Sequence, residues 1–302
     1  MKVCVIGGCG YIGAMLVPLL LSDGHKVTVC DTQWFGHGYP ASNGNLTVIV
    51  CDMRSIDLGT PDAIIHLASL SNNNMYGVNR SLARATNCWL PPRTSARMIY
   101  ASSVAAYGTS DAMLSEDAPM KPTTPYGMDK VFCEEQVLGA GGTVVRSASV
   151  CGSSMNMRFD LTVNRLVRDA VHQDEMKVNG GSQKRCHVHM HDLCEFYRLL
   201  LKAPKEKIAG EAFNVVAENA SVLENAMLVA RTIKGSPKIE IGPATDDRSY
   251  MVSGAKATDI LGFVPKKRVE HAILEIETRL LAGYWRDSYT NKSYMRMLDA
   301  IP

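Results

Sequence analysis

The chain has 302 residues, of which 46% are hydrophobic and 21% charged, a composition typical of a globular protein that buries a core. The formal net charge is only +2 and the Lys and Arg residues are scattered, so we expect no nucleic-acid partner. No apolar run approaches the roughly 20 residues needed to cross a bilayer, so we expect no membrane partner either.

The first half of the chain alternates short apolar segments with segments of helical spacing. The helical patterns cover residues 11–21, 78–90 and 126–138. Two of the strand-like segments, residues 46–50 and 63–67, have a composition that predicts burial on both faces. The complete set of predicted strands is 2–6, 26–30, 46–50, 63–67, 97–101 and 143–146.

Short apolar strands separated by helices predict an α/β fold with a doubly wound parallel sheet. From about Cys151 onward the pattern becomes irregular, with Pro, Gly and Asn spread through it. This change predicts a smaller, mixed C-terminal lobe over the carboxyl edge of the sheet. We therefore divide the chain into a sheet domain, 1–150, and a lobe, 151–302, and expect segments around 185–216 to return to the sheet domain.

A glycine-rich turn follows the first predicted strand and opens the first predicted helix. Its spacing is G-x-x-G-x-x-G, formed by Gly7, Gly10 and Gly13, with Tyr11 and Ile12 between the last two. Gly7 allows a sharp turn, Gly10 a close approach to a pyrophosphate, and Gly13 close packing of helix on strand. The first N–H groups of the helix then face the phosphates. A purely structural glycine turn is the alternative interpretation.

An acidic residue, Asp31, ends the second predicted strand. A carboxylate there accepts hydrogen bonds from the adenosine ribose and repels a 2′-phosphate, which favours NAD over NADP. The sequence thus predicts a Rossmann domain that binds NAD. Asp52 and Met53, after the third strand, are placed to reach the adenine, although Asp52 is equally explained as a solvated loop residue.

Tyr126 and Lys130 are four residues apart at the start of a predicted helix, which places them on one face. A nearby ammonium group favours the phenolate, so the tyrosine can act as a base while hydride leaves for the cofactor. Ser102 and Ser103 end a strand at the carboxyl edge, where ligands of such sheets bind. We favour Ser103 as the serine that bonds the reacting oxygen, and Ser102 remains the alternative.

Taken together, these motifs resemble the extended short-chain dehydrogenases/reductases, in particular the NAD-dependent nucleotide-sugar epimerase/dehydratase family. The similarity covers nearly the whole chain, and the motifs come in the order of that family. They are the glycine turn, His66-Leu67-Ala68, Asn79, Ala101-Ser102-Ser103 with Tyr107-Gly108, Tyr126 with Lys130, Arg146 to Gly152, Arg185 to Leu193, and Asp247-Arg248-Ser249-Tyr250.

The resemblance implies a nucleoside-diphosphate sugar as substrate and a 4-keto sugar as intermediate. Tyr126, Lys130 and Ser103 match the catalytic positions of the family. Arg185 and Arg248 match positions that hold the diphosphate, a role suited to the planar fork of arginine, and Ser149 is a further expected substrate contact. The remaining expected cofactor contacts are Leu67, Ala68, Ser69, Asn79, Ala101, Ser102, Tyr126 and Lys130.

The residues after Ser103 distinguish between subclasses of that family. Dehydratases and decarboxylases carry an acidic residue there, whereas this chain has Val104, Ala105 and Ala106. This departure favours a 4-epimerase, in which hydride passes to NAD and back. The alternative is a 4-dehydrogenase or 4-reductase, because residues 157–164 resemble a subgroup that includes enzymes acting on capsule sugars and on substrates of the GDP-heptose type. A non-catalytic NAD-sensing protein is a third possibility, and the retained Tyr126 and Lys130 argue against it.

Three further features bear on metals, assembly and location. His187, His189 and His191 alternate as H-x-H-x-H, but they lack the Cys/His spacings of known zinc sites, so no metal is expected. The resemblance implies a homodimer formed through the helices near 78–90 and 126–138, and an aromatic tail, 284–297, docks on the body or a partner or is loosely ordered. Nine cysteines without a CxxC motif and the absence of a signal peptide predict a reducing, cytoplasmic location.

Overall fold

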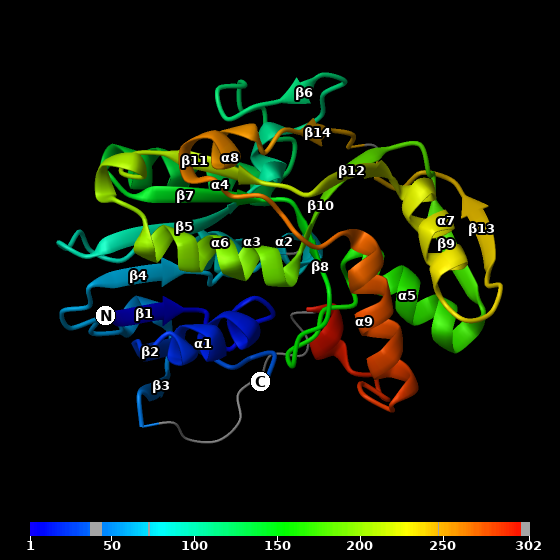
Figure 1. Ribbon diagram of the computed structural model, residues 1–302, viewed down its shortest axis with the longest axis horizontal. Coiled ribbons are helices and arrows are strands. Elements are labelled where there is room, and N and C mark those ends of the chain that lie inside the picture. The colour runs from blue at the N-terminus through cyan, green and yellow to red at the C-terminus, as the bar shows by residue number, and fades with distance from the viewer. Residues whose placement is uncertain (37–43, 72, 247, 297–302) are drawn as a thin grey trace.

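A computed structural model describes residues 1–36, 44–71, 73–246 and 248–296. Its centre is a parallel sheet of seven strands in the order β11-β7-β5-β4-β1-β2-β3, in which every neighbouring pair is parallel (Figure 1). The strands are β1 (Lys2–Ile6), β2 (Lys26–Asp31), β3 (Leu46–Val50), β4 (Ala63–His66), β5 (Arg97–Ser103), β7 (Thr143–Ser147) and β11 (Ala212–Val215).

Helices cover both faces of this sheet, because its strands are apolar on both sides. On one face α1 (Gly13–Ser22) packs against α6 (Met190–Lys202). On the other, α4 (Pro125–Gly139) contacts β5 and β7, and it packs against α2 (Asn73–Val78) and α3 (Arg80–Asn87). The predicted doubly wound α/β fold is confirmed.

Two details of the predicted elements are wrong. β3 is not buried on both faces, since it forms the edge of the sheet and leaves Val48 37% and Val50 62% exposed. The helix predicted over 78–90 is shorter: α3 covers Arg80–Asn87, and the separate helix α2 ends before it at Val78. The side-chain oxygen of Asn79 accepts the N–H of Leu82 at 2.9 Å, and this cap starts α3 as a separate helix.

The second lobe lies beyond the carboxyl ends of the central strands (Figure 1). A three-stranded sheet consists of β8 (Ser149–Cys151), β10 (Lys184–His189) and β12 (Glu218–Ser221). Of the segment around 185–216, β10 lies in this sheet, whereas α6 packs on α1 and β11 pairs with β7. The other elements are β6 (Met113–Leu114) with β14 (Met251–Val252), β9 (Glu175–Asn179) with β13 (Lys238–Gly242), and helices α5 (Thr162–Gln173), α7 (Val222–Thr232), α8 (Ala255–Leu261) and α9 (Val269–Leu281).

Within the described part of the chain, no helix combines the length and apolar character required to cross a membrane.

Candidate active site

A cleft of about 1150 Å³ lies where the central sheet meets the second lobe. Its walls come from the ends of β1, β2, β4 and β5 on one side and from segments of the second lobe on the other. This is the carboxyl edge of the sheet, where open α/β sheets bind ligands. Tyr11 ties the walls together, because its hydroxyl donates to the carbonyl of Gly152 at 2.6 Å and its carbonyl accepts from the hydroxyl of Ser154.

The glycine turn forms the floor at one end of the cleft. Gly7 has φ +81°, and a Cβ there would lie 2.4 Å from the backbone nitrogen of Ala68. A Cβ on Gly13 would lie 2.1 Å from the carbonyl oxygen of Gly8, so only glycine lets α1 begin this close to the turn. Gly10 lines the cleft at the turn that leads into α1, and the amino end of this helix adds positive potential there.

The two acidic residues near the adenosine end differ in their surroundings. The carboxylate of Asp31 accepts the backbone N–H of Cys9 at 2.9 Å and of Gln33 at 2.7 Å. Burial nevertheless raises the pKa of Asp31 above its usual value. Asp52 instead caps a short 3₁₀ turn and forms an ion pair with Arg54 at 2.6 Å near the surface, and Met53 behind it is buried.

The two serines at the end of β5 point in opposite directions. Ser102 is 3% exposed, and its hydroxyl bonds to Glu134 of α4, which also forms an ion pair with Arg146 at 2.8 Å. Ser103 lines the cleft and accepts the N–H of Ala105 at 3.2 Å, as the cap of the 3₁₀ helix Val104–Tyr107. Ser102 is occupied in the core, so the geometry favours Ser103 as the serine that meets a ligand.

Tyr126 and Lys130 lie on one face of α4, beside Ser103. The helix begins at Pro125, and the hydroxyl of Thr124 accepts the N–H of Gly127. The ammonium of Lys130 lies 5.5 Å from the centre of the Tyr126 ring, and it donates to the Tyr100 hydroxyl at 3.1 Å and the Ala101 carbonyl at 2.8 Å. Burial lowers the pKa of Lys130 to about 8.

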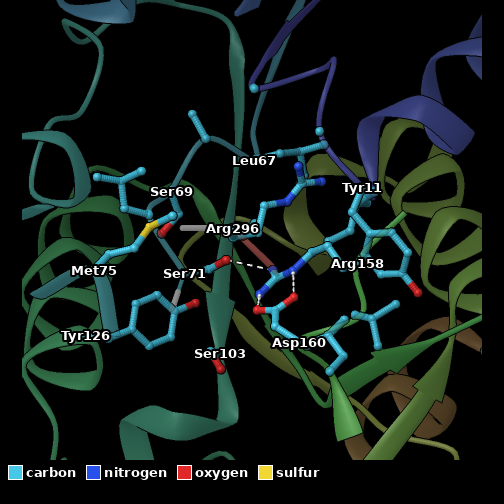
Figure 2. A pocket seen from close by; sticks show the side chains of 18 of the residues that line it. Tyr11, Leu67, Ser69, Ser71, Met75, Ser103, Tyr126, Arg158, Asp160 and Arg296 are labelled. Carbon is cyan, nitrogen blue, oxygen red and sulfur yellow. Dashed lines mark hydrogen bonds and ion pairs between the residues drawn. The ribbon is translucent and has the colours of Figure 1, made fainter. Parts of the chain in front are cut away.

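The phenol of Tyr126 faces the cleft, with Ser69 and Ser103 on either side (Figure 2). Burial raises its pKa above the usual value, while the positive charge of Arg158 and hydrogen bonds with Ser103 and Ser69 lower it. From the sequence we expected Lys130 to lower this pKa, but the lysine is directed at Tyr100 and Ala101 instead. Arg158 is the cation that opposes burial in this structure.

Arg158 projects from the second lobe toward the tyrosine. Its guanidinium forms a two-point pair with Asp160, at 2.6 and 3.0 Å, and donates to the hydroxyl of Ser71 at 2.7 Å (Figure 2). It is 14% exposed, so its charge is only weakly screened by water. No motif spacing marked Arg158 as a site residue; its proximity to Tyr126 depends on the docking of the two lobes.

The two arginines expected to hold a diphosphate converge on one carboxylate at the far end of the cleft. Arg185 lies 3.0 Å and Arg248 2.6 Å from Asp246, and both line the cleft together with Ser149. Burial of Asp246 acts to raise its pKa, but the two guanidiniums outweigh this and lower the pKa to about 2. Asp246 therefore carries a full negative charge that holds both arginines in position.

Most of the predicted cofactor-binding residues line this cleft, but Asn79 does not. Its side chain caps α3, and it is absent from the described lining. The lining also contains an arginine that no motif indicated, Arg296 from the C-terminal tail. The predicted residues that do line the cleft are Gly7, Gly10, Tyr11, Ile12, Gly13, Asp31, Asp52, Met53, Leu67, Ala68, Ser69, Ala101, Ser102, Ser103, Tyr126, Lys130, Ser149, Arg185 and Arg248.

The three alternating histidines do not share one face. His187 and His189 are buried on β10, but α6 begins at Met190, so His191 leaves the strand. The ring of His189 accepts the N–H of His191 and lies 3.3 Å from Glu275. Nowhere in residues 1–36, 44–71, 73–246 and 248–296 do three or more His, Cys, Asp or Glu side chains gather as potential metal ligands.

Residues 3–216 match the model of the NAD dependent epimerase/dehydratase family. The chain belongs to this family. Because the match spans the glycine turn, Ser103, Tyr126 and Lys130, the resemblance inferred from the motifs is confirmed. The cofactor of the family is NAD, as the glycine turn and Asp31 predicted.

Two curated relatives are similar over most of their length. The chain is 26% identical to the UDP-glucose 4-epimerase of Halalkalibacterium halodurans, over 90% of this chain and 94% of the relative. It is 27% identical to a UDP-N-acetyl-alpha-D-glucosaminuronate decarboxylase of Bacillus cytotoxicus, over 79% and 82%. Among solved structures, UDP-glucuronic acid 4-epimerase from Bacillus cereus, in complex with UDP-glucuronic acid and NAD, superimposes with a TM-score of 0.81 at 21% identity, covering 94% of this chain and all of that one.

The residues of the cleft fit a dinucleotide. Gly7 and Gly13 let the backbone of the turn pack against Ala68 and Gly8 without a Cβ, and Gly10 lines the cleft. Asp31 stands at the end of β2, where an adenosine ribose is bound in such folds. Tyr126, Ser103 and Lys130 line the same cleft.

Proposed function

We propose that this protein is an NAD-dependent nucleotide-sugar 4-epimerase that acts through a 4-keto sugar. The observation that carries the proposal is the position of the Ser103 and Tyr126 side chains, which face the same cleft as the glycine turn (Figure 2). The names of the relatives support a UDP-sugar as the first substrate to test. The identity of the sugar is left to experiment.

In this proposal the bound cofactor supplies the acceptor and donor of the hydride at C4. Tyr126 removes the proton of the C4 hydroxyl and returns it later, and Ser103 holds the same oxygen against the phenol. Lys130 orients the end of β5 through the Ala101 carbonyl, and its positive charge lies behind the ring. Arg158 favours the phenolate from the opposite wall.

The wall of the cleft after Ser103 supports epimerisation over elimination. Val104 and Ala105 line the cleft after Ser103, and neither carries an acid of the kind that the resemblance assigns to dehydratases. Asp160 is the nearest acid from the second lobe, and it is paired with Arg158. Oxidation at C4 followed by reduction needs only the serine, tyrosine and lysine.

Arg185 and Arg248 are proposed to bind the diphosphate of the substrate, with Ser149 beside them. Their joint pairing with Asp246 keeps both guanidiniums at the end of the cleft opposite Asp31. This arrangement assigns the two ends of the cleft to the two nucleotides, with the sugar between them near Tyr126.

We further propose a cytoplasmic homodimer that pairs through α3 and α4. Met128 and Phe132 of α4 are 51% and 45% exposed, and Val78 at the end of α2, a helix that packs against α4, is 70% exposed. Phe132→Glu is expected to give a monomer in light scattering. The nine free cysteines suit a reducing compartment.

The proposal is tested by incubating the purified protein with UDP-, GDP- and dTDP-sugars while following sugar stereochemistry by NMR and NADH by absorbance. Inversion at C4 without net NADH supports the epimerase. Accumulation of NADH with a keto product instead identifies a 4-dehydrogenase. Tyr126→Phe is expected to lower the rate by about 10²- to 10⁴-fold without changing NAD binding; an unchanged rate, or no altered sugar at all, would reject the catalytic assignment.

A further inference from the structure

The C-terminal tail, residues 284–296, packs on the body of the protein and ends inside the cleft. Trp285 lies edge-on to Phe159, with ring centres 5.7 Å apart, and the Tyr289 ring stacks on Arg168 at 4.1 Å. The carbonyl of Tyr294 accepts the N–H of Phe159 at 2.8 Å. The tail is thus anchored along α5 and the segment before it, close to the amino end of α1 (Figure 1). Met297 lies outside the described residues.

Arg296 stands at the end of the anchored tail and is 5% exposed. Its guanidinium donates to the side-chain oxygen of Asn156 at 2.9 Å and stacks on Phe35 at 4.9 Å. Asn156 in turn donates to the carbonyl of Cys9, within the glycine turn, at 2.7 Å. One amide side chain therefore connects the arginine to the turn that faces a pyrophosphate.

The hydrogen bonds of Arg296 leave its charge without a direct counterion. They end on the carbonyls of Phe35, Ser293 and Asn156 and on the Asn156 amide, and no carboxylate in the described segments forms an ion pair with this guanidinium. Burial and the repulsion of Arg158 lower the pKa of Arg296 to about 9. Burying an arginine in this way is costly unless an anion joins it.

The acids near Arg296 are already engaged. Asp160 is paired with Arg158, and Asp31 accepts two backbone N–H groups. The Nη groups of Arg296 donate to protein oxygens, and the residue lines the cleft between Leu67 and Arg158 (Figure 2). The amino end of α1 adds positive potential to the same region.

We propose that Arg296 binds the pyrophosphate of the cofactor, opposite the glycine turn, so that the tail acts as a strap across the dinucleotide. This inference rests on the proposed function insofar as the cleft holds NAD. A substrate diphosphate has the same chemistry, but the link through Asn156 to Cys9 places Arg296 at the cofactor end, away from Arg185 and Arg248. The tail thereby adds Arg296, from near the C-terminus, to a cofactor site that is otherwise formed by residues near the N-terminus.

The test compares ligands with and without a diphosphate. The full-length protein, freed of cofactor, is titrated with ADP-ribose, adenosine and UDP by calorimetry. Arg296→Gln is expected to weaken ADP-ribose binding about tenfold or more, because a charge-assisted hydrogen bond is lost. Adenosine and UDP binding should not change. Arg286→Gln, an exposed arginine of the same tail, is the matched control and should bind all three as wild type does.

Each other result has a defined meaning. Equal or tighter ADP-ribose binding by Arg296→Gln would overturn the proposal, and so would an equal loss for adenosine, which indicates a structural effect of the tail. Loss of UDP binding instead would assign Arg296 to the substrate and likewise reject a cofactor role. If Arg296→Gln does not fold, Arg296→Lys is measured instead, because it keeps the positive charge. This variant should keep the wild-type preference for ADP-ribose over adenosine, and loss of that preference would overturn the proposal. Wild-type protein that binds neither NAD nor ADP-ribose would overturn the cofactor assignment as well.

Discussion

The cofactor end of the cleft is built from one short stretch of chain, whereas the opposite end draws its charges from segments far apart. Gly7 directly follows β1, Gly13 begins α1 and Asp31 ends β2, and these elements follow each other directly. Arg158, Arg185 and Arg248 come from three different parts of the second lobe. The first end is a fixed backbone shape that a single Cβ destroys, and the second is a set of side chains that can be changed one at a time.

The largest effect is therefore expected at the glycine turn. In Gly13→Ala the new Cβ meets the Gly8 carbonyl at 2.1 Å, and neither backbone can yield without moving α1 away from the turn. We expect NAD binding to fall by more than about 100-fold and stability to fall by about 2 kcal/mol or more. Fluorescence titration with NADH and thermal unfolding measure both.

Gly139→Ala is the matched control for this change. It lies at the end of α4, where an added Cβ meets nothing within 4 Å, so it should bind NADH normally and be neutral or stabilised by up to about 1 kcal/mol. If Gly13→Ala also bound NADH as wild type does, the glycine turn would not be a rigid backbone shape on which cofactor binding depends.

The same contrast explains which parts of the site could be predicted from the sequence. Glycine spacing, Asp31 and the pair Tyr126 and Lys130 act within one turn or one helix, so sequence distance fixes their geometry. The choice between Ser102 and Ser103 needed the structure, because it depends on Glu134 across the interface with α4. Arg158 and Arg296 reach the cleft only through tertiary packing, and their sequence surroundings carry no comparable spacing rule.

Some errors have the same cause. Asn79 was expected to contact the cofactor from within a helix, but its oxygen caps α3, a local competition that hydrophobic periodicity does not reveal. Lys130 was expected to lower the Tyr126 pKa, yet its partners are Tyr100 and Ala101 on the neighbouring strand. The cap of Asn79 is a local contact, whereas the partners of Lys130 depend on tertiary packing.

The second-largest effect is expected at Lys130, in the middle of the cleft. Lys130→Met removes the ammonium and should lower turnover by about 100-fold or more. It should not lower the Tm at pH 7, because a buried ammonium whose pKa is lowered to about 8 opposes folding below that pH. Activity and stability are thus expected to respond in different directions.

The pH dependence of unfolding checks this reasoning. In the folded protein Lys130 loses its proton near pH 8, whereas an unfolded lysine keeps it to about pH 10, so wild-type stability should gain a contribution between these values as the pH rises. Lys130→Met should lack that gain relative to wild type. A variant that is several degrees less stable at pH 7, with an unchanged pH profile, would show that the lysine supports the fold.

A smaller effect is expected at the substrate end, where Arg158 opposes the burial of Tyr126. Removing its charge in Arg158→Gln raises the pKa of Tyr126, and the tyrosine must be ionised to accept a proton. The alkaline rise of kcat/KM should move to higher pH, with about tenfold lower activity at pH 7 and recovery at high pH. Arg279→Gln, whose guanidinium contacts Met155 and the Tyr284 ring, is the control. A uniform loss of activity at every pH in Arg158→Gln would indicate a positioning role instead.

The smallest effect is expected from Asp52. The size of this effect shows whether Asp52 contacts the cofactor or only lies at the edge of its site. The carboxylate of Asp52 is partly exposed and engaged with Arg54, so Asp52→Asn should change the Kd for NADH by less than about twofold. Asp31→Asn weakens the hydrogen bond from Cys9 of the glycine turn and the one from Gln33. It should weaken NADH binding about tenfold and reduce the preference for NADH over NADPH. Titrations of both variants with both nucleotides decide the matter. If Asp52→Asn and Asp31→Asn lose the same amount of NADH affinity, Asp52 also contacts the adenosine. The rigid end of the cleft would then extend beyond the glycine turn and Asp31.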